Sequence, residues 1–147
     1  MPVGQRVDPY RGFRFRVEID GIQTASFSEA TIPSSDSPPV DYREGTDPTT
    51  VRKLSALTTY ASLTLKKGMT DSTDLYAWRR QVEQTGASGS RRNISLVLVD
   101  DEGNDKLRWD IIEAWPQKYE TTGFNATGSE VMVETLEIVH EGITRLA

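Results

Sequence analysis

The sequence contains no cysteine and only one histidine, His140, among its 147 residues. Without cysteine there are no disulfide bonds, no thiolate nucleophile and no cysteine-based zinc site, which fits a reducing compartment. A serine hydrolase triad would have to use His140, and this residue lies within an apolar, strand-like stretch. Ser88, in the sequence GASG, does not have the spacing of a nucleophile elbow. We therefore expect no catalytic residue.

Long apolar runs and an excess of positive charge are also missing. No segment approaches the roughly 18 apolar residues of a membrane span, and the N-terminus lacks the apolar run of a signal peptide. We expect no direct membrane anchoring, and synthesis and folding in the cytosol without a signal peptide. The 17 basic and 22 acidic residues give a net charge of −5, which disfavours a dedicated nucleic-acid binder.

Cofactor and metal motifs are missing as well. There is no Gly-rich dinucleotide loop and no phosphate-binding loop. The acidic run DDEGND at 100–105 suggests calcium, but Gly103 stands fourth where an EF-hand loop needs glycine sixth. This run is better interpreted as a solvated hairpin. We expect no cofactor and no metal site.

What the sequence does contain is repeated alternation of apolar and polar residues, typical of strands with one buried face. It is clearest from Phe13 to Ile19, and the following Asp20-Gly21 predicts a tight hairpin turn. Further strands are expected at 22–27, 62–66, 94–99, 107–115 and 130–140. The alternation slips near Thr135 and Leu136, which predicts a β-bulge.

One short helix is expected at about 72–84. Asp71 or Ser72 is suited to cap its N-terminus, and Gly86 to end it. The side chains expected to pack it onto the core are Leu75, Trp78 and Val82. The predicted fold class is therefore mainly β, a small barrel or sandwich of about six or seven strands with one packed helix. A single domain over 1–147 is expected, since this length suffices for one core.

The stretch VDYREGTDPTTVRKL at 40–54 keeps neither a helical nor a strand period. It follows a run at 30–39, rich in proline and serine, that we expect to be a loop. Fully extended, 40–54 would span roughly 50 Å, which exceeds the body of one small domain. We therefore expect an extended arm. In addition, the strands at 94–99 and 130–140 carry apolar residues on both faces, which predicts contact with neighbouring chains.

An ordered series of short motifs runs through nearly the whole chain, from about 8 to 143. It includes DPYRGFRFRVEIDG at 8–21, YREG at 42–45, VRKL at 51–54, LKKG at 65–68, AWP at 114–116 and ETLEIVHEG at 134–142. Together they resemble the tail tube protein family of contractile phages, and most closely the inner tube proteins of phage-derived contractile injection systems. The proline- and serine-rich run at 30–39 departs from this resemblance.

The resemblance implies a non-catalytic subunit that forms hexameric rings, which stack into a hollow tube inside a contractile sheath for delivery through a target envelope. It also implies assembly in the bacterial cytoplasm. The implied partners are further copies of the chain, the sheath protein, baseplate and tube-terminating proteins, and protein or DNA cargo in the lumen. It places the inter-ring stacking arm at Tyr42, Arg43, Glu44, Gly45, Asp47, Pro48, Arg52 and Lys53. The arm carries cations at Arg43, Arg52 and Lys53 and anions at Asp41, Glu44 and Asp47. A head-to-tail contact between unlike faces can therefore be self-complementary.

Two alternatives remain from the residues alone. One is a monomeric ligand-binding β-barrel with a closed apolar pocket near Trp109 and Trp115. The other is a hydrolase that depends on His140. The sequence leaves open whether the particle is a phage tail or an injection system, and which residues face a lumen.

Overall fold

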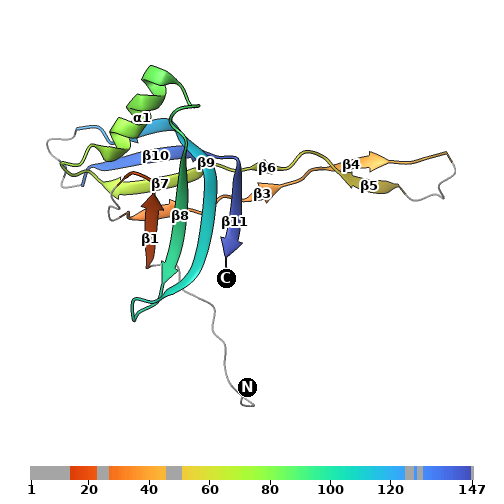
Figure 1. The fold of residues 1–147 in the computed structure, drawn as a ribbon, viewed down its shortest axis with the longest axis horizontal. Coiled ribbons are helices and arrows are strands. Elements are labelled where there is room, and N and C mark those ends of the chain that lie inside the picture. Colours follow the sequence, from red (N-terminus) through yellow and green to blue (C-terminus); the bar gives the residue numbers. More distant parts are fainter. Residues whose placement is uncertain (1–13, 23–26, 46–50, 125–127, 129–130, 147) are drawn as a thin grey trace, which may run out of the picture.

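The computed structural model describes residues 14–22, 27–45, 51–124, 128 and 131–146. Within them the chain forms eleven strands and one helix, in two layers with a long projection (Figure 1). In chain order these elements are β1 Phe15–Ile19, β2 Glu29–Thr31, β3 Ser35–Asp36, β4 Pro39–Tyr42, β5 Arg52–Ser55, β6 Thr59–Tyr60, β7 Leu63–Gly68, α1 Asp74–Thr85, β8 Arg92–Val99, β9 Asp105–Thr121, β10 Val133–Val139 and β11 Gly142–Leu146.

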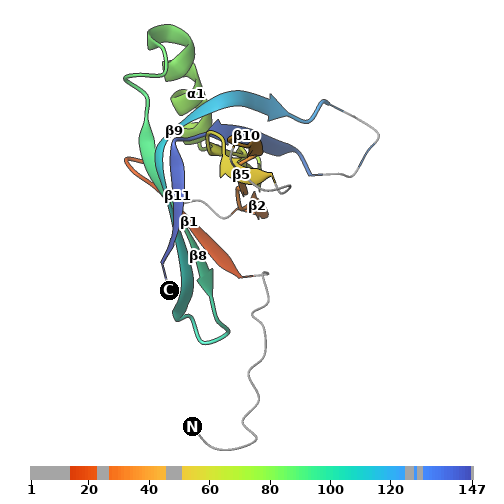
Figure 2. The same ribbon diagram turned by 90° about the vertical axis from the view of Figure 1, so that its right-hand side faces the viewer.

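The long strand β9 belongs to both layers. Its first part pairs with β8 and β11, and with β1 these form sheet A, in the order β1-β8-β9-β11. Its second part pairs with β10, and with β7 and β2 this forms sheet B, in the order β9-β10-β7-β2. Figure 2 shows sheet A descending from the level of sheet B.

Glu113 lies where β9 passes from one sheet to the other. Its φ of 54° is in the left-handed region, which costs a residue with a side chain roughly 1–2 kcal/mol. β11 pairs with β9 up to Ile112, and β10 pairs with it from Trp115 onward. The local backbone at Glu113 therefore redirects β9 between the two layers.

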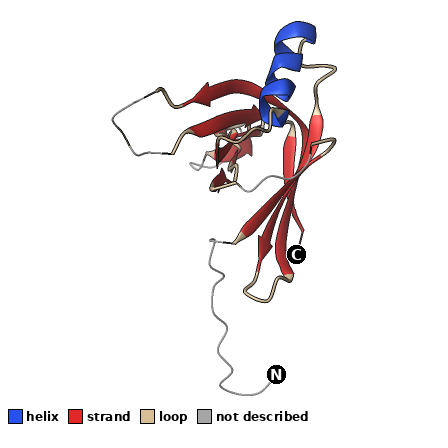
Figure 3. Cartoon of the chain, turned by 90° about the vertical axis from the view of Figure 1, so that its left-hand side faces the viewer, coloured by secondary structure: helices blue, strands red, loops and turns tan. Residues whose placement is uncertain are grey.

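The core lies between the two sheets and beneath the helix, which packs against β9 (Figure 3). The Trp78 indole is buried and its Nε1 donates a hydrogen bond to the Ser90 carbonyl at 2.6 Å. Arg79 donates to the Pro116 carbonyl at 2.9 Å, which ties the helix to β9. The buried core cluster consists of Val17, Ile19, Leu63, Leu65, Leu75, Trp78, Ile94, Leu96, Ile111, Ala114, Leu136 and Ile138.

The mainly β prediction with one helix is confirmed. The helix ends at Thr85, and Gly86 follows at a φ of 82° with its N–H bonded to the Val82 carbonyl. It begins at Asp74, two residues later than predicted, and Ser72, one of the two residues predicted to cap it, accepts a hydrogen bond from the first helical N–H. The N-cap is Thr73, whose side chain makes no capping bond, while the Ser72 hydroxyl is 3.4 Å from the Asp74 N–H.

Three further predictions need correction. The run 30–39 is not a continuous loop, because β3 and the start of β4 form ladders within it. The expected strand at 107–115 continues to Thr121, since Pro116 stands at a register shift where its missing N–H is tolerated. This shift lies between Glu137 and Ile138 on β10, two residues beyond the predicted bulge.

The Asp20-Gly21 turn is present, with Gly21 at a φ of 75° and a bridge between Ile19 and Ile22. The rest of the strand expected at 22–27 lies mostly outside the described residues. β11 was not predicted, because Ile143 and Leu146 are too few to establish a period.

A candidate assembly surface

The most distinctive feature of the structure is a two-stranded arm that projects from the body (Figure 1). The arm consists of residues 32–45 and 51–62, with ladders β3–β6 near the body and β4–β5 farther out. A backbone hydrogen bond from Ala56 to Pro38 (2.7 Å) lies between these ladders, and one from Ala61 to Ser34 (2.9 Å) continues the pairing on the body side of β3 and β6. The expected arm at 40–54 is thus the outer part of a longer ribbon.

The outer ladder has two chemically different faces. Val40 lies opposite Leu54, and Tyr42 lies opposite Arg52, so these four residues share one face. Val40 is 48% exposed and Leu54 is 50% exposed. A two-stranded ribbon without a core is marginal in water. The apolar face of the arm therefore favours packing against something outside the chain.

The opposite face of the arm is ionic. Asp41 lies across from Lys53 and the two side chains form an ion pair.

The outer end of β4 carries further predicted contact residues. The Tyr42 hydroxyl donates to Glu44 at 2.6 Å, and this hydrogen bond raises the pKa of Tyr42. Arg43 and Gly45 are also exposed. Asp47 and Pro48, the other two expected contact residues, lie outside the described part of the chain.

His140 holds the base of the arm against the body. Its Nε2 is 3.0 Å from the Ala61 carbonyl, and its ring lies 5.5 Å from the Tyr60 ring. Because a carbonyl only accepts hydrogen bonds, Nε2 carries the proton. The other ring nitrogen, Nδ1, is buried and has no hydrogen-bond partner among the described residues. Sequence reasoning missed this role, because Tyr60 and Ala61 are distant in the chain.

Sheet A offers a second surface for assembly. It ends in β1 on one side and in β11 on the other, and within the described residues no further strand pairs with either outer edge, apart from the single bridge from Ile19 to Ile22. Unpaired strand edges are templates for pairing with another chain. Ile112 and Leu146, near the β11 edge, are large apolar side chains left about half exposed. Both edges are therefore suited to contact between subunits.

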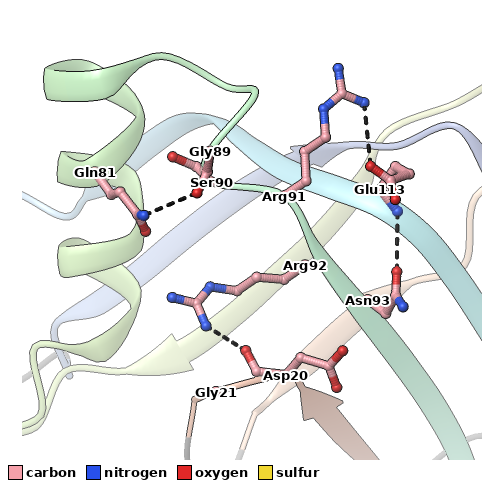
Figure 4. Close-up of a pocket in the computed structure, with 9 residues that line it drawn as sticks. All are labelled: Asp20, Gly21, Gln81, Gly89, Ser90, Arg91, Arg92, Asn93 and Glu113. Atoms are coloured by element: carbon pink, nitrogen blue, oxygen red, sulfur yellow. Dashed lines mark hydrogen bonds and ion pairs between the residues drawn. The ribbon is translucent and has the colours of Figure 1, made fainter.

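A polar pocket of about 440 Å³ lies where the turn after β1, the loop after α1 and the start of β8 meet (Figure 4). Arg92 donates to the Asp20 carbonyl and stacks over the Trp78 ring at 5.7 Å. A side chain at Gly21 would collide with this guanidinium. These contacts brace the β1 turn against the helix.

The far side of the same pocket is formed by Arg91, Asn93 and Glu113. Arg91 pairs with Glu113 at 3.9 Å and also with Glu141, while the Asn93 side-chain carbonyl accepts from the Glu113 N–H at 3.3 Å. Both contacts hold the bend in β9. The polar side chains that line the pocket are thus accounted for by contacts that stabilise the β1 turn and the bend in β9.

An apolar hollow of about 350 Å³ opens between sheet A and β2. Phe15, Leu96, Leu107 and Trp109 contribute to its lining from sheet A. Trp115, which the ligand-binding alternative also placed here, is not part of this lining.

The side chains expected to pack the helix onto the core are Leu75, Trp78 and Val82. Leu75 and Trp78 belong to the buried core cluster, and Val82 is half-buried.

In the part of the chain that the structure describes, no three histidine, aspartate or glutamate side chains lie close enough together to bind a metal ion. No helix among these residues has the length and hydrophobicity to cross a membrane.

Comparison with known families identifies the family of the chain. Residues 11–144 match the family of the T4-like virus tail tube protein gp19. The chain belongs to this family of tail tube proteins. The family is a structural one, which agrees with a protein dominated by an exposed arm and open sheet edges.

Solved structures share the fold of this tail tube protein. A chain of the anti-feeding prophage tube-terminating cap matches with a TM-score of 0.84 and 20% identity, covering 100% of this chain and 99% of that one. A chain of the sheath/tube terminator of the extracellular contractile injection system PVC gives 0.83 and 20%, covering 96% and 99%. A chain of the PVC sheath–tube complex gives 0.79 and 22%, covering 95% and 92%. No curated protein matches the sequence.

Proposed function

We propose that this tail tube protein is the subunit of the inner tube of a contractile injection particle. Six copies form a ring, rings stack into a hollow tube, and a contractile sheath surrounds the tube and drives it through a target envelope. The observation that carries this proposal is the arm, whose apolar face is left about half exposed at Val40 and Leu54. The membership in a tail tube family and the shared fold with injection-system proteins support it.

The arm provides the contact between rings. Its two faces are unlike each other, and so are the two ends of the subunit, so the contact is head-to-tail and propagates along one axis. Tyr42, Arg43, Glu44, Gly45, Asp47, Pro48, Arg52 and Lys53 are the proposed contact residues. Within a ring, β1 of one copy lies beside β11 of the next, which continues sheet A around the circle and removes its open edges.

The proposed partners follow from this arrangement. They are other copies of the chain, a sheath protein outside the tube, baseplate and tube-terminating proteins at its ends, and a cargo in the lumen. A phage tail is the alternative setting for the same tube. The runner-up function is a monomeric ligand-binding barrel, which the apolar hollow beside Trp109 favours.

Negative-stain electron microscopy and light scattering of the concentrated protein test the proposal, with preformed tube fragments added as seeds. We expect stacked six-fold rings with an open centre. Arg43→Glu should shorten or abolish the tubes, whereas Gln84→Glu, on the exposed helix surface, should leave them unchanged. A monomer that fails to extend seeds and binds a fluorescent hydrophobe stoichiometrically would instead establish the ligand-binding function.

A further inference from the structure

The single histidine of the chain, His140, lies where the arm joins the body. It follows the end of β10, which runs beside the start of β7, since Ile138 pairs with Leu63 (Figure 1). The ring of His140 therefore reaches Tyr60 and Ala61 at the base of the arm, although 79 positions separate it from Ala61 in the sequence. We name His140, Tyr60 and Ala61 the arm latch.

The contacts of the arm latch fit a neutral imidazole ring. Nε2 of His140 lies 3.0 Å from the Ala61 carbonyl oxygen, which can only accept, so the proton of the neutral ring is on Nε2. Nδ1 is then the nitrogen without a proton. It is buried and has no hydrogen-bond partner among the described residues. The ring also contacts Tyr60, with 5.5 Å between the ring centroids.

The arm latch acts on both strands of the arm. The Ala61 N–H donates to the Ser34 carbonyl on the first strand at 2.9 Å, while the Ala61 carbonyl accepts from His140 on the body. A second contact with the body, from the Gln117 amide to the Ser62 hydroxyl, is longer, at 3.3 Å. Release of His140 therefore removes the shorter of these two side-chain hydrogen bonds at the base of the arm.

The charged groups near the arm latch are paired with one another. Glu141, next to the latch histidine in the chain, pairs with Arg91, and Glu113 of β9 pairs with the same guanidinium at 3.9 Å. From the arm, Tyr60 is the titratable group that contacts the ring. The start of β7, at 63–65, carries no charged residue. Among the described residues, no carboxylate is hydrogen-bonded to the ring.

A second proton on His140 has no suitable place in the closed latch. Histidine in ordinary surroundings gains this proton between about pH 8 and pH 5. In the latch the proton would be added to Nδ1, and a buried N–H of a charged ring would then lack an acceptor. Such burial is unfavourable. The protonated ring therefore moves into water, which frees the Ala61 carbonyl and ends the contact with Tyr60.

We propose that the arm latch is a pH-sensitive switch, which holds the arm while His140 is neutral and releases it in acid. The consequence for stacking rests on the proposed function, because an arm released at its base loses the fixed direction that a contact between rings requires. The sign follows from linkage: the open latch binds one more proton than the closed latch, so acid favours the open form. The latch is therefore closed near about pH 8 and opens as the pH falls toward about 5.

The first test uses the subunit in solution and does not depend on tubes. Because His140 is the only histidine, NMR of imidazole nitrogens follows a single ring, and near pH 8 we expect the neutral form with its proton on Nε2. Amide exchange, corrected for the intrinsic effect of pH, should be roughly tenfold faster across residues 51–62 at pH 5 than at pH 8. Protection of β8 and β9 should change little. The midpoint of the loss should match the midpoint of ring protonation.

The control variant is His140→Gln, because its side-chain amide can donate to the Ala61 carbonyl and does not titrate. Protection of its arm should be the same at both pH values. A ring that gains its proton while the arm stays protected would overturn the inference, and so would an equal loss of protection in His140→Gln. If this variant does not fold, the wild type alone decides, since two midpoints that disagree also overturn the inference.

The second test measures stacking. Tube fragments formed from the wild type at pH 7.5 are extended with wild-type or His140→Gln subunits at pH 7.5 and at pH 5, and their length is measured by negative-stain electron microscopy. Wild-type subunits should extend the fragments several-fold less at pH 5, whereas His140→Gln should extend them equally at both pH values. Equal acid sensitivity of the two proteins would overturn the switch. Subunits that stack at neither pH would contradict the proposed function, while the NMR result on free subunits would still decide whether the latch exists.

Discussion

The Lys67 ammonium lies 3.4 Å from the Glu134 carboxylate on the core side of sheet B, and both side chains are less than 5% exposed. Lys67 comes from β7 and Glu134 from the neighbouring strand β10, in direct register. The Tyr119 hydroxyl donates to the second carboxylate oxygen at 2.8 Å. A charge pair thus occupies two positions that apolar residues fill elsewhere in the sheet.

Removing one member of this pair should destabilise the protein strongly. Lys67→Met leaves the Glu134 carboxylate buried without a counter-charge, which typically costs about 3–5 kcal/mol. Lys67→Met/Glu134→Leu removes both charges and should be close to the wild type or more stable. Urea denaturation of the two single variants and the double variant measures the coupling. Equal losses in the single and double variants would show that the pair has no such role.

Stability should fall in alkaline solution because of Tyr119. Burial, followed by the hydrogen bond to Glu134, raises the pKa of Tyr119 from 10.0 to about 12. A raised pKa means that the native state holds its proton longer than the unfolded state. The contribution is therefore complete below pH 10 and is lost between pH 10 and about 12. Urea midpoints across this interval should fall less for Tyr119→Phe than for the wild type.

The hydrogen bond from Trp78 to Ser90 should be needed for helix docking. Trp78→Phe keeps an aromatic ring but leaves the Ser90 carbonyl without its donor, so we expect a loss of about 1–3 kcal/mol. Tyr76→Phe, on the exposed side of the same helix, should change stability by less than about 0.5 kcal/mol. Thermal unfolding followed by circular dichroism distinguishes the two. A Trp78→Phe protein as stable as the wild type would show that this bond contributes nothing.

The sequence predicted the strands and the helix where one period persisted, and failed where a partner residue decides the structure. On β10, Leu136 and Ile138 face the core and Glu134 joins them, because Lys67 on another strand neutralises it. From the sequence alone, the alternation slipped near Thr135 and Leu136, and nothing indicated that Glu134 would be buried. No local pattern shows which distant side chain will lie opposite.

The arm was predicted from its composition and not from a periodic pattern. Its composition is too polar for a core and too rich in threonine and valine for a linker, so 40–54 stood out. Its two faces were not predictable, because a shift of one residue in register would exchange the face of Leu54 for that of Lys53. The described structure sets this register with Val40 opposite Leu54.

The apolar face of the arm should matter for assembly and not for folding. Leu54→Asp places a charge on the proposed contact between rings, so tubes should be lost while the unfolding midpoint stays within experimental error. Ser55→Asp adds the same charge one residue away on the ionic face, and should retain tubes. Electron microscopy and sedimentation quantify assembly. Identical behaviour of the two variants would show that the faces do not differ in function.

His140 should hold the arm in the orientation needed for stacking. His140→Ala removes both the hydrogen bond to the Ala61 carbonyl and the ring contact with Tyr60. We expect faster amide exchange across residues 51–62, fewer tubes, and little change in the protection of β8 and β9. His140→Gln keeps a side-chain donor that can reach the carbonyl, and should restore part of the protection. If His140→Ala left exchange in the arm unchanged, the anchoring role would be wrong. Loss of a hydrolytic activity from both variants, with stacking intact, would instead support the catalytic alternative.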